Sequence, residues 1–565
     1  MPDAPRLKVV LCWHMHQPEY RDLVTDESLL PWTYLHAIKD YVDMAAHLES
    51  VPRAAAVVNF SPVLLEQLAA YERELRAHLE HGAPIRDPLL AALTPEGIPQ
   101  NLAQRADLIR ACLKVNRERI VERFAPFHEL AQLAGGFLAP GAVRYAAREF
   151  LVDLAVWYHL GWLGESVRRT DLRVAALMAK ERHFDAADVR TLLEVIGELI
   201  ARLIPRYRSL AASGRVELSV TPYGHPILPL LIDFRAAREA LPDCTLPAES
   251  AYPGGEARGR WHLASAIEVF QRTFGFRPAG CWPAEGGVSD RALALIEEFG
   301  FRWAATGEAV LRNSLSRHEP GNGEREAESL HLPYRLTGRA LGVFFRHDAL
   351  SDLIGFSYAK WHGDDAAANL AAHLEQLAGE LKSGPGRVVA IVLDGENAWE
   401  YYPFNGYFFL SALYERLAAS ERIELTTFAR ALDAVRAAEL PSLVAGSWVY
   451  GTFSTWIGEP AKNRAWEMLC DAKRVFDEAS AAGSLGAEQM RAAERQLGVC
   501  EGSDWCWWFG EGNPAEQVAA FDALYRRHLA NLYRLLGRAA PAYLAEPFAR
   551  GGGSPELGGV MRRAQ

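Results

Sequence analysis

The chain has 565 residues, half of them apolar and 10% aromatic, so it can bury a large core and should form more than one domain. Its net charge of -11 and the absence of Lys/Arg runs exclude the basic surface that a nucleic-acid partner needs. No apolar stretch is long enough to span a membrane, and the seven scattered cysteines fit neither a disulfide framework nor a structural zinc site. The first apolar run lacks the features of a signal peptide, so we expect a cytoplasmic protein.

Short apolar runs, each followed by a helical stretch, predict seven strands. They lie at residues 7–13, 54–60, 215–222, 278–283, 302–307, 341–347 and 388–393. Strands that alternate with helices form a parallel sheet covered on both faces, and the regular alternation favours an α/β barrel over an open sheet. An eighth run, at 423–428, predicts either an edge strand or a strand that closes the barrel.

The rest of the chain is mainly helical in pattern. Residues 63–213 are too many for an ordinary connection between a strand and a helix, so we expect a helical insertion within a barrel domain of residues 1–435. Residues 436–550 predict a C-terminal helical domain, and the Gly-rich residues 551–565 predict a flexible tail.

Acids, imidazoles and indoles gather where the predicted strands end. In barrels of this kind the carboxyl ends of the strands face the catalytic mouth, whereas a purely structural barrel needs no such groups there. The strand ends and the residues just after them supply His14, His16, Gln17, His225, Trp282, Glu285, Asp394 and Glu396, and the third predicted strand contains Glu217.

Glu285 and Asp394 are the candidate catalytic pair. Glu285 precedes two glycines, which allow a ligand close to the backbone, and Asp394 ends a buried apolar strand. Two carboxyl groups from different strands are the minimum equipment for cleaving a glycosidic bond. The alternative for Glu285 is a favourable charge at a helix N-terminus, and for Asp394 an Asp-Gly turn.

Aromatic residues support a sugar site, because the apolar faces of pyranose rings stack on indole and phenol rings. Trp282 and Trp399 flank the proposed acids, and "EGSDWCWWFGEGN" places Trp505 and Trp507 in a turn-rich segment. Packing between domains is the alternative for this second cluster. We include Trp399, Trp505 and Trp507 among the candidate substrate-binding residues.

His14 and His16 also raise a metal-site alternative, since alternate residues of a strand share one face. His225, His347 and Asp394 could complete such a site. Gln17, Pro18 and the many indoles have no role in a metal cage, whereas they fit a sugar site. We therefore assign no metal or other cofactor.

Taken together and in order, five motifs resemble glycoside hydrolase family 57, whose members act on α-glucans. They are "WHMHQPEY", "VELSVTPYGHPILPLL", "CWPAEGGVS", "LDGENAWEYYPFNG" and "SDWCWWFGEGN". The resemblance implies a (β/α)7 barrel that leaves residues 423–428 outside the closed sheet. It also implies a retaining mechanism without a metal, in which Glu285 matches the nucleophile and Asp394 the general acid/base.

The same resemblance implies that His14 and His16 bind the sugar being cleaved. By this match, substrate-contacting positions are Glu217, Trp282, Glu396, Asp504 and Trp507. From the residues themselves we add Gln17, His225, Trp399 and Trp505. An ionised Glu285 nearby should raise the pKa of Asp394, because like charges disfavour ionising both.

The motifs most resemble the α-amylase and amylopullulanase branch of the family. We therefore expect a retaining hydrolase of α-1,4-linked glucans, such as starch, glycogen or maltodextrin, with α-1,6 linkages left open. A 4-α-glucanotransferase with the same catalytic pair is the first alternative. A metal-dependent barrel hydrolase and a non-catalytic glucan-binding protein are the alternatives from other classes.

Overall fold

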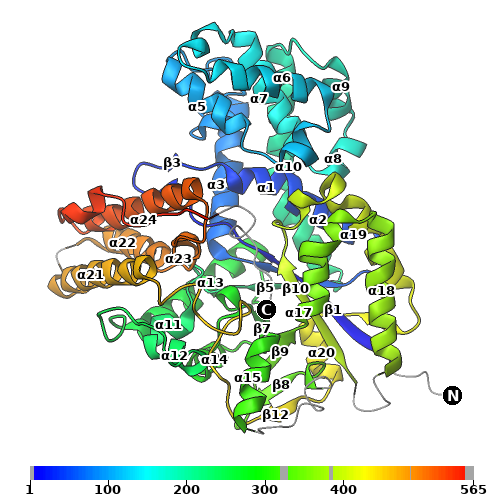
Figure 1. Ribbon diagram of the computed structural model, residues 1–565, viewed down its shortest axis with the longest axis vertical. Helices are drawn as coiled ribbons and strands as arrows, with labels where there is room; N and C mark the ends of the chain where they lie inside the picture. The colour runs from blue at the N-terminus through cyan, green and yellow to red at the C-terminus, as the bar shows by residue number, and fades with distance from the viewer. Residues whose placement is uncertain (1–5, 319–328, 381–385, 484, 554–565) are drawn as a thin grey trace.

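The computed structural model describes residues 6–318, 329–380, 386–483 and 485–553. A barrel forms the centre, a helical insertion extends from one end of it, and C-terminal helices pack against its side (Figure 1). Residues 554–565, most of the predicted flexible tail, lie outside the described residues.

Seven parallel strands form the closed barrel, which confirms the predicted fold class. They are β1 (Leu7–Met15), β4 (Ala56–Phe60), β5 (Val216–Val220), β6 (Gly280–Cys281), β7 (Trp303–Gly307), β9 (Gly342–Arg346) and β10 (Val388–Asp394). Their order around the ring is β10-β1-β4-β5-β6-β7-β9, and pairing of Ala390 with Arg346 closes it. The strands are buried on both faces, which explains their unbroken apolar runs.

Three short strands extend the sheet beyond the ring. The eighth predicted run forms β11 (Ile423–Leu425), which pairs with Leu7–Val9 at the start of β1. The part of β1 that pairs with β4 comes later, at Cys12–Met15. The sequence did not predict β8 (Tyr334–Leu336), antiparallel to β9, or β12 (Ala438–Leu440), parallel to β8. A separate two-stranded hairpin joins β2 (Arg21–Asp22) and β3 (Glu27–Ser28).

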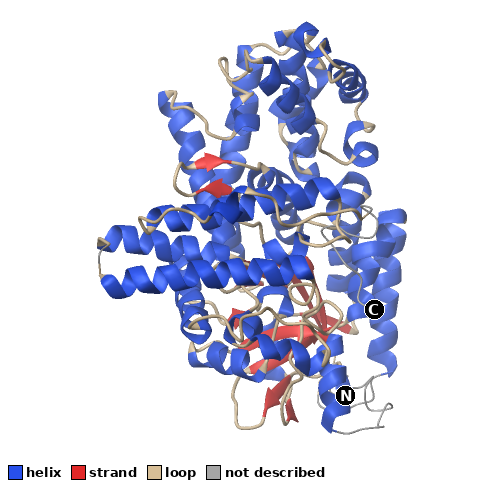
Figure 2. Cartoon of the chain, turned by 60° about the vertical axis from the view of Figure 1, so that its left-hand side comes forward, coloured by secondary structure: helices blue, strands red, loops and turns tan. Residues whose placement is uncertain are grey.

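Helices lie above the barrel strands and on both sides of them in the view of Figure 2. Those that follow barrel strands include α1 (Trp32–His36), α2 (Val42–Ser50), α11 (Leu228–Ile232), α12 (Ala237–Ala240), α13 (Gly255–Phe274), α14 (Asp290–Glu298), α15 (Glu308–His318), α17 (Asp348–Asp352), α18 (Gly363–Glu380), α19 (Tyr407–Ala419) and α20 (Phe428–Ala434). Side chains cap several of them, as Ser289 does for α14 and Thr427 for α20.

The helical insertion runs between β4 and β5. It comprises α3 (Pro62–His81), α4 (Pro88–Ala91), α5 (Leu102–Cys112), α6 (Ala125–Phe137), α7 (Arg148–Trp162), α8 (Glu165–Thr170), α9 (Leu172–Lys180) and α10 (Ala186–Ala212). The long helices α3 and α10 connect it to the barrel (Figure 1). Pro62 begins α3 and left-handed Gly82 ends it, while Asp185 and Asp188 form a capping box at the start of α10.

The C-terminal helices are α21 (Pro460–Ala482), α22 (Ala487–Cys500), α23 (Asp504–Trp508) and α24 (Ala515–Leu535). Before them, residues 441–459 cross the barrel, where Gly446 pairs with Val288 by backbone hydrogen bonds. A buried ion cluster attaches the helices to α13: Arg258 and His262 each approach the Glu501 carboxylate to 2.8 Å. Within the described residues, no helix is long and apolar enough to cross a membrane.

Candidate active site

Glu285 lies in a tight turn directly after β6. The turn, η5 (Ala284–Gly286), gives Glu285 a positive φ of 56°, which is uncommon for a residue other than glycine. Thr306 of β7 donates from its hydroxyl to the Gly286 carbonyl, 2.6 Å away, and so fixes the turn to the neighbouring strand. A strained backbone of this kind persists only where neighbouring contacts hold it in place, and such residues are common at functional sites.

Trp448 holds the Glu285 side chain. Its indole Nε1 donates to Glu285 Oε2 over 2.9 Å, and its backbone N–H donates to the Glu285 carbonyl over 3.1 Å. The Trp448 ring also meets the buried Trp282 ring edge to face, with centroids 5.1 Å apart. One residue from the crossing segment 441–459 therefore fixes both the backbone and the carboxyl group of Glu285.

Asp394 ends β10 in register with His14 of β1. Burial raises its pKa to about 6, and a 2.8 Å hydrogen bond from Asn397 Nδ2 opposes that rise. The expected rise therefore occurs, but burial is its largest cause, not the charge of Glu285. The charge of the buried Arg346 guanidinium also lowers the Asp394 pKa. The same guanidinium lies 5.7 Å from the ring of Trp448, the residue that holds Glu285.

Glu396 lies beside Asp394 and is buried. Its Oε1 accepts from the backbone N–H of His16 and from Gln17 Nε2, both over 3.2 Å. Burial and the nearby charge of Asp394 raise the Glu396 pKa well above its usual value. The site thus contains two carboxyl groups, Asp394 and Glu396, with raised pKa values.

The three predicted histidines form a stacked array. The His16 and His225 rings are 3.8 Å apart between centroids, and His14 lies 5.1 Å from His225. Asn59 Oδ1 accepts a hydrogen bond from His14 Nδ1 over 2.7 Å, so the Nδ1 atom carries the ring proton. A neutral imidazole has one ring proton, so His14 Nε2 is an acceptor, and His225 Nε2 donates to it over 3.0 Å. Burial lowers the pKa of His14 to about 3 and that of His225 well below its usual value, so both rings are neutral.

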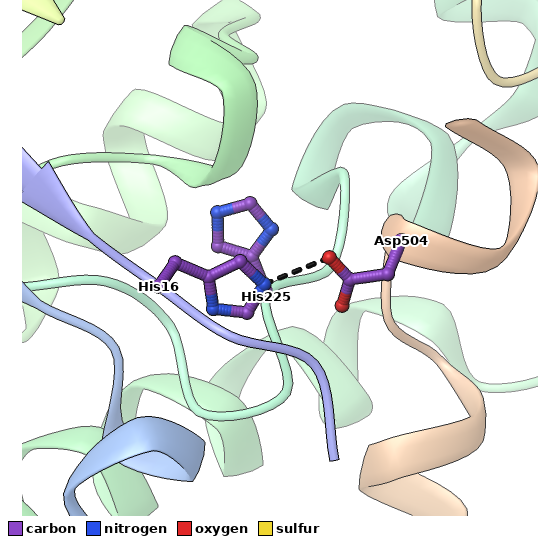
Figure 3. A group of neighbouring side chains, drawn as sticks. All are labelled: His16, His225 and Asp504. Carbon is purple, nitrogen blue, oxygen red and sulfur yellow. Dashed lines mark hydrogen bonds and ion pairs between the residues drawn. The ribbon is translucent and has the colours of Figure 1, made fainter. Parts of the chain in front are cut away.

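Asp504 reaches this array from the C-terminal helices. Figure 3 shows it facing His16, whose Nε2 donates to Asp504 Oδ1 over 2.8 Å. His16 Nδ1 contacts Ser61 Oγ at 2.7 Å, and His225 Nδ1 contacts Ser503 Oγ at 2.8 Å. Segments that are far apart in the sequence therefore meet at one point of the barrel mouth.

A metal ion is the other ligand to consider here. His16, His225 and Asp504 each offer one atom within 4.8 Å of the others. Hydrogen bonds nevertheless account for both ring nitrogens of every histidine in the array. The cluster is therefore complete as a hydrogen-bonded network.

Glu217 is the predicted site residue that the structure places elsewhere. It is the second residue of β5, near the amino end of the barrel, and not at the mouth. Trp303 Nε1 donates to its Oε1 over 2.6 Å, and the Ala429 backbone N–H donates to its Oε2 over 3.0 Å. Through these contacts Glu217 joins β7 to α20. It does not reach the mouth, because parallel strands bring only their carboxyl ends there.

Two predicted tryptophans are core residues. Trp399 donates to the Gly395 carbonyl over 2.8 Å and packs edge to face on Trp13. Trp505 donates to the Val499 carbonyl over 3.0 Å and packs on Tyr525 within the C-terminal helices. Trp507 is also mostly buried, with its ring 6.1 Å from that of Trp456.

Trp448, Asn59 and Arg346 were not among the predicted site residues. Trp448 stands in a Gly/Ser-rich turn, which suggests an aromatic platform, but nothing local linked it to Glu285. Asn59 is the last but one residue of β4 and is in reach of the strand-end rule. Arg346 ends β9 and forms ion pairs with Asp348 and Asp352, and nothing in the sequence showed that its charge also acts on Asp394.

In this parallel barrel, carboxyl groups from separate strand ends lie beside indoles and imidazoles. Such an arrangement is typical of a glycoside hydrolase of the barrel class. Comparison with known families agrees. The model of "Glycosyl hydrolase family 57" matches residues 10–444, which is most of the chain. The chain therefore belongs to glycosyl hydrolase family 57.

Solved structures of similar fold include a branching enzyme of this family from Pyrococcus horikoshii, with 17% identity and a TM-score of 0.56, covering 95% of this chain and 93% of that one. A branching enzyme from Thermococcus kodakaraensis has 15% identity and a TM-score of 0.57, with coverage of 94% and 90%. An α-amylase from Thermotoga maritima has 14% identity and a TM-score of 0.55, with coverage of 96% of both chains. At these identities the likeness concerns the fold.

Proposed function

We propose that the protein is a retaining hydrolase of α-1,4-linked glucans, with Glu285 as nucleophile and Asp394 as general acid/base. The observation that carries the proposal is the contrast between the two acids. Glu285 accepts an N–H hydrogen bond from Trp448, which stabilises negative charge on it, while burial raises the pKa of Asp394 to about 6. One acid is thus suited to attack and the other to carry a proton.

The reaction takes two steps. Protonated Asp394 gives its proton to the glycosidic oxygen as Glu285 attacks the anomeric carbon, so the leaving sugar departs and an ester to Glu285 forms. Asp394, now ionised, takes a proton from water as the water oxygen attacks the same carbon. The ester breaks, the sugar keeps its anomeric configuration, and both acids return to their initial states.

The substrate class is supported by the relatives and by the polar groups of the site. The structures of similar fold are named as branching enzymes and an α-amylase, which all act on α-glucans. Asp504 offers a carboxylate to sugar hydroxyls at the barrel mouth, and the stacked, fully hydrogen-bonded rings of His14 and His225 support its partner His16. We propose that residues 436–550 complete the substrate site through Asp504 and Trp507.

A 4-α-glucanotransferase is the second candidate. Transfer and hydrolysis share both carboxyl groups and differ in whether a sugar hydroxyl or water attacks the ester. The observation that favours transfer is the burial of Glu396, 2% exposed, two residues from the half-buried Asp394, because a site that excludes water protects the ester from hydrolysis.

Incubation with maltoheptaose tests the proposal. Proton NMR of the first products should show the α-anomer, and shorter sugars alone mean hydrolysis, whereas longer sugars mean transfer. Asp394→Asn should lower kcat roughly 10²–10⁴-fold and Glu285→Gln at least as much, while calorimetry still detects oligosaccharide binding. Near-normal turnover in either variant, or a β-anomer as first product, would overturn the assignment.

A further inference from the structure

Arg346, the last residue of β9, is buried beside the strand that carries Asp394. Only 6% of the residue is exposed, and each of its three guanidinium nitrogens has a partner. Nε donates to the Val392 carbonyl of β10 over 2.9 Å, Nη1 to Asp348 Oδ1 over 2.6 Å and Nη2 to Asp352 Oδ1 over 2.8 Å. Val392 lies two residues before Asp394, so the guanidinium is bonded to the backbone just before this candidate acid.

The same guanidinium approaches the residue that holds Glu285. Its carbon atom lies 5.7 Å from the centroid of the Trp448 ring, which is within the range of a cation–π contact. The Trp448 indole donates to Glu285 Oε2, and the Trp448 backbone N–H donates to the Glu285 carbonyl. Arg346 therefore contacts the strand of one candidate acid and the indole partner of the other.

Two aspartates of α17 fix the direction of the guanidinium. A buried guanidinium keeps its proton, so it needs acceptors on all sides. Asp348 and Asp352 meet this need from the helix that follows β9, and the Val392 N–H of β10 donates to Ser351 Oγ of the same helix over 3.4 Å. A planar guanidinium can direct donors at β10 and at both aspartates at once, whereas the ammonium of a lysine is a single point of charge on a flexible stem.

We propose that Arg346 is a positioning residue of the reaction, which holds the end of β10 and the Trp448 ring so that the two candidate acids face the same sugar. Its charge has a second effect. Burial raises the Asp394 pKa to about 6, and the positive charge of Arg346 opposes that rise, so it favours the ionised form that the second step needs. The roles of the two acids rest on the proposed function, whereas the effect of Arg346 on Asp394 does not.

Other groups act on the same part of the site. The charged, polar and titratable side chains that influence Asp394 or Arg346 are Asn397, His16, Glu396, Asp348, Asp352 and Glu308. Burial raises the pKa of Asp348 to about 6 as well, against the opposing charge of Arg346. Asp348 and Asp394 therefore titrate in the same pH range, so a test of pH dependence needs a variant of each.

The variants Arg346→Lys and Arg346→Gln separate the two effects. Lysine keeps the charge and loses the fork, so kcat on maltoheptaose should fall roughly 10–100-fold with a much smaller change in KM, and the alkaline limb of kcat/KM should stay in place. Glutamine also loses the charge, so the Asp394 pKa should rise and the alkaline limb should move to higher pH. Wild-type kcat in both variants, or an unmoved limb in Arg346→Gln, would overturn the proposal.

Arg168→Lys is the matched control. Arg168 is a buried arginine of α8 in the helical insertion, and it bonds Glu165 and the Leu160 carbonyl. This variant should lower the unfolding temperature and leave kcat and the alkaline limb unchanged. An equal fall of kcat in Arg168→Lys and Arg346→Lys would mean that the loss follows from general destabilisation, which contradicts the positioning role.

Asp352→Asn tests the same idea if Arg346→Gln does not fold. An asparagine oxygen still accepts from Nη2, but one negative charge beside the guanidinium is lost. The charge of Arg346 is then less compensated, so the alkaline limb should move to lower pH. A limb that stays in place or moves to higher pH would contradict the effect of the guanidinium on Asp394.

Infrared spectroscopy of the free enzyme measures this effect without turnover. A protonated carboxyl group has a C=O stretching band, and Asp394→Asn and Asp348→Asn identify the bands of the two acids. The Asp394 band should persist to higher pH in Arg346→Gln than in the wild type and in Arg168→Lys. A band that disappears at the same pH in all three proteins would overturn the inference. Lack of any activity on α-glucans would contradict the proposed function instead, and the infrared result would still decide whether Arg346 acts on Asp394.

Discussion

Trp448 shows how much a single residue outside the barrel strands contributes to the candidate site. Its indole N–H reaches Glu285 from the segment that follows the last strand, β12. Its ring packs edge to face on Trp282 and lies 5.7 Å from the Arg346 guanidinium, and these contacts limit the direction of its N–H group. If Glu285 is the nucleophile, as proposed, it loses little entropy when the substrate binds.

The Trp448→Phe variant should keep the ring and lose the donor. A hydrogen bond to a charged group contributes about 1.5–3 kcal/mol, so we expect kcat to fall roughly 10–100-fold with a much smaller change in KM. Steady-state kinetics on maltoheptaose measure both constants. Trp466→Phe is the control, since it removes a 3.0 Å indole hydrogen bond from α21 to the Trp456 carbonyl, away from Glu285. Unchanged kcat in Trp448→Phe would contradict the positioning role.

Asn397 should influence the pH dependence of the reaction. Its side chain donates to Asp394 Oδ2 and lowers the pKa of that acid, which burial raises to about 6. Asp394 must be protonated for the first step, so kcat/KM should fall as the pH rises through about 6. In Asn397→Ala the pKa of Asp394 rises further, and the alkaline limb should move to higher pH. A limb that stays in place, or moves to lower pH, would show that another group controls it.

At the scale of the elements, β6 is the shortest barrel strand and the one that carries Glu285. Gly280 in β6 faces Trp303, and a Cβ there would lie 1.8 Å from the indole ring. Only glycine lets the Trp303 ring cross the strand at this point. The same ring donates to Glu217, so Gly280 and Trp303 pack together near the base of the strand that precedes the turn of Glu285.

The seven barrel strands could be predicted because each is an apolar run that ends in polar residues, as in β10. The strand-end rule also selected His14, Asp394 and Glu285, and the structure places all three at or just after strand ends. Glu217 lies near the amino end of its predicted strand, and its expected site role came from the family resemblance alone. The stacking argument failed for Trp399 and Trp505, because an indole in a turn-rich segment looks the same whether it packs in a core or faces a ligand.

At the scale of the whole molecule, the buried cluster around Glu501 attaches the C-terminal helices to the barrel. Arg258, His262 and Tyr252 all contact its carboxyl group, and Ser503 and Asp504 of the site follow two and three residues later. Arg258 and His262 offset the effect of burial and hold the Glu501 pKa down, at about 2. The position of Asp504 against His16 therefore depends on an ion cluster outside the site.

This cluster predicts how stability depends on pH. The folded pKa of Glu501 is below its unfolded value of 4.5, so the cluster stabilises the fold above pH 4.5, and that contribution is lost as the pH falls toward 2. Glu501→Gln should lower the free energy of unfolding by about 3–5 kcal/mol at neutral pH and flatten this dependence. Thermal unfolding measured from pH 3 to 7 tests it.

The control is Asp364→Asn, which breaks an exposed ion pair with Arg416 and should cost at most about 1 kcal/mol. Equal destabilisation by the two variants would mean that the Glu501 cluster has no special role in attaching the C-terminal helices.

Trp448 and Asp504 both come from beyond the last strand, while Glu285 and the histidines come from before it. During synthesis on the ribosome, the barrel strands emerge well before Asp504 does. The nascent chain therefore holds the proposed nucleophile without its indole donor and a histidine array without its acid. If the proposed site is correct, catalytic competence should arise only after residue 504 has been synthesised, so a prematurely terminated polypeptide that lacks residues 448–508 should be inactive on α-glucans.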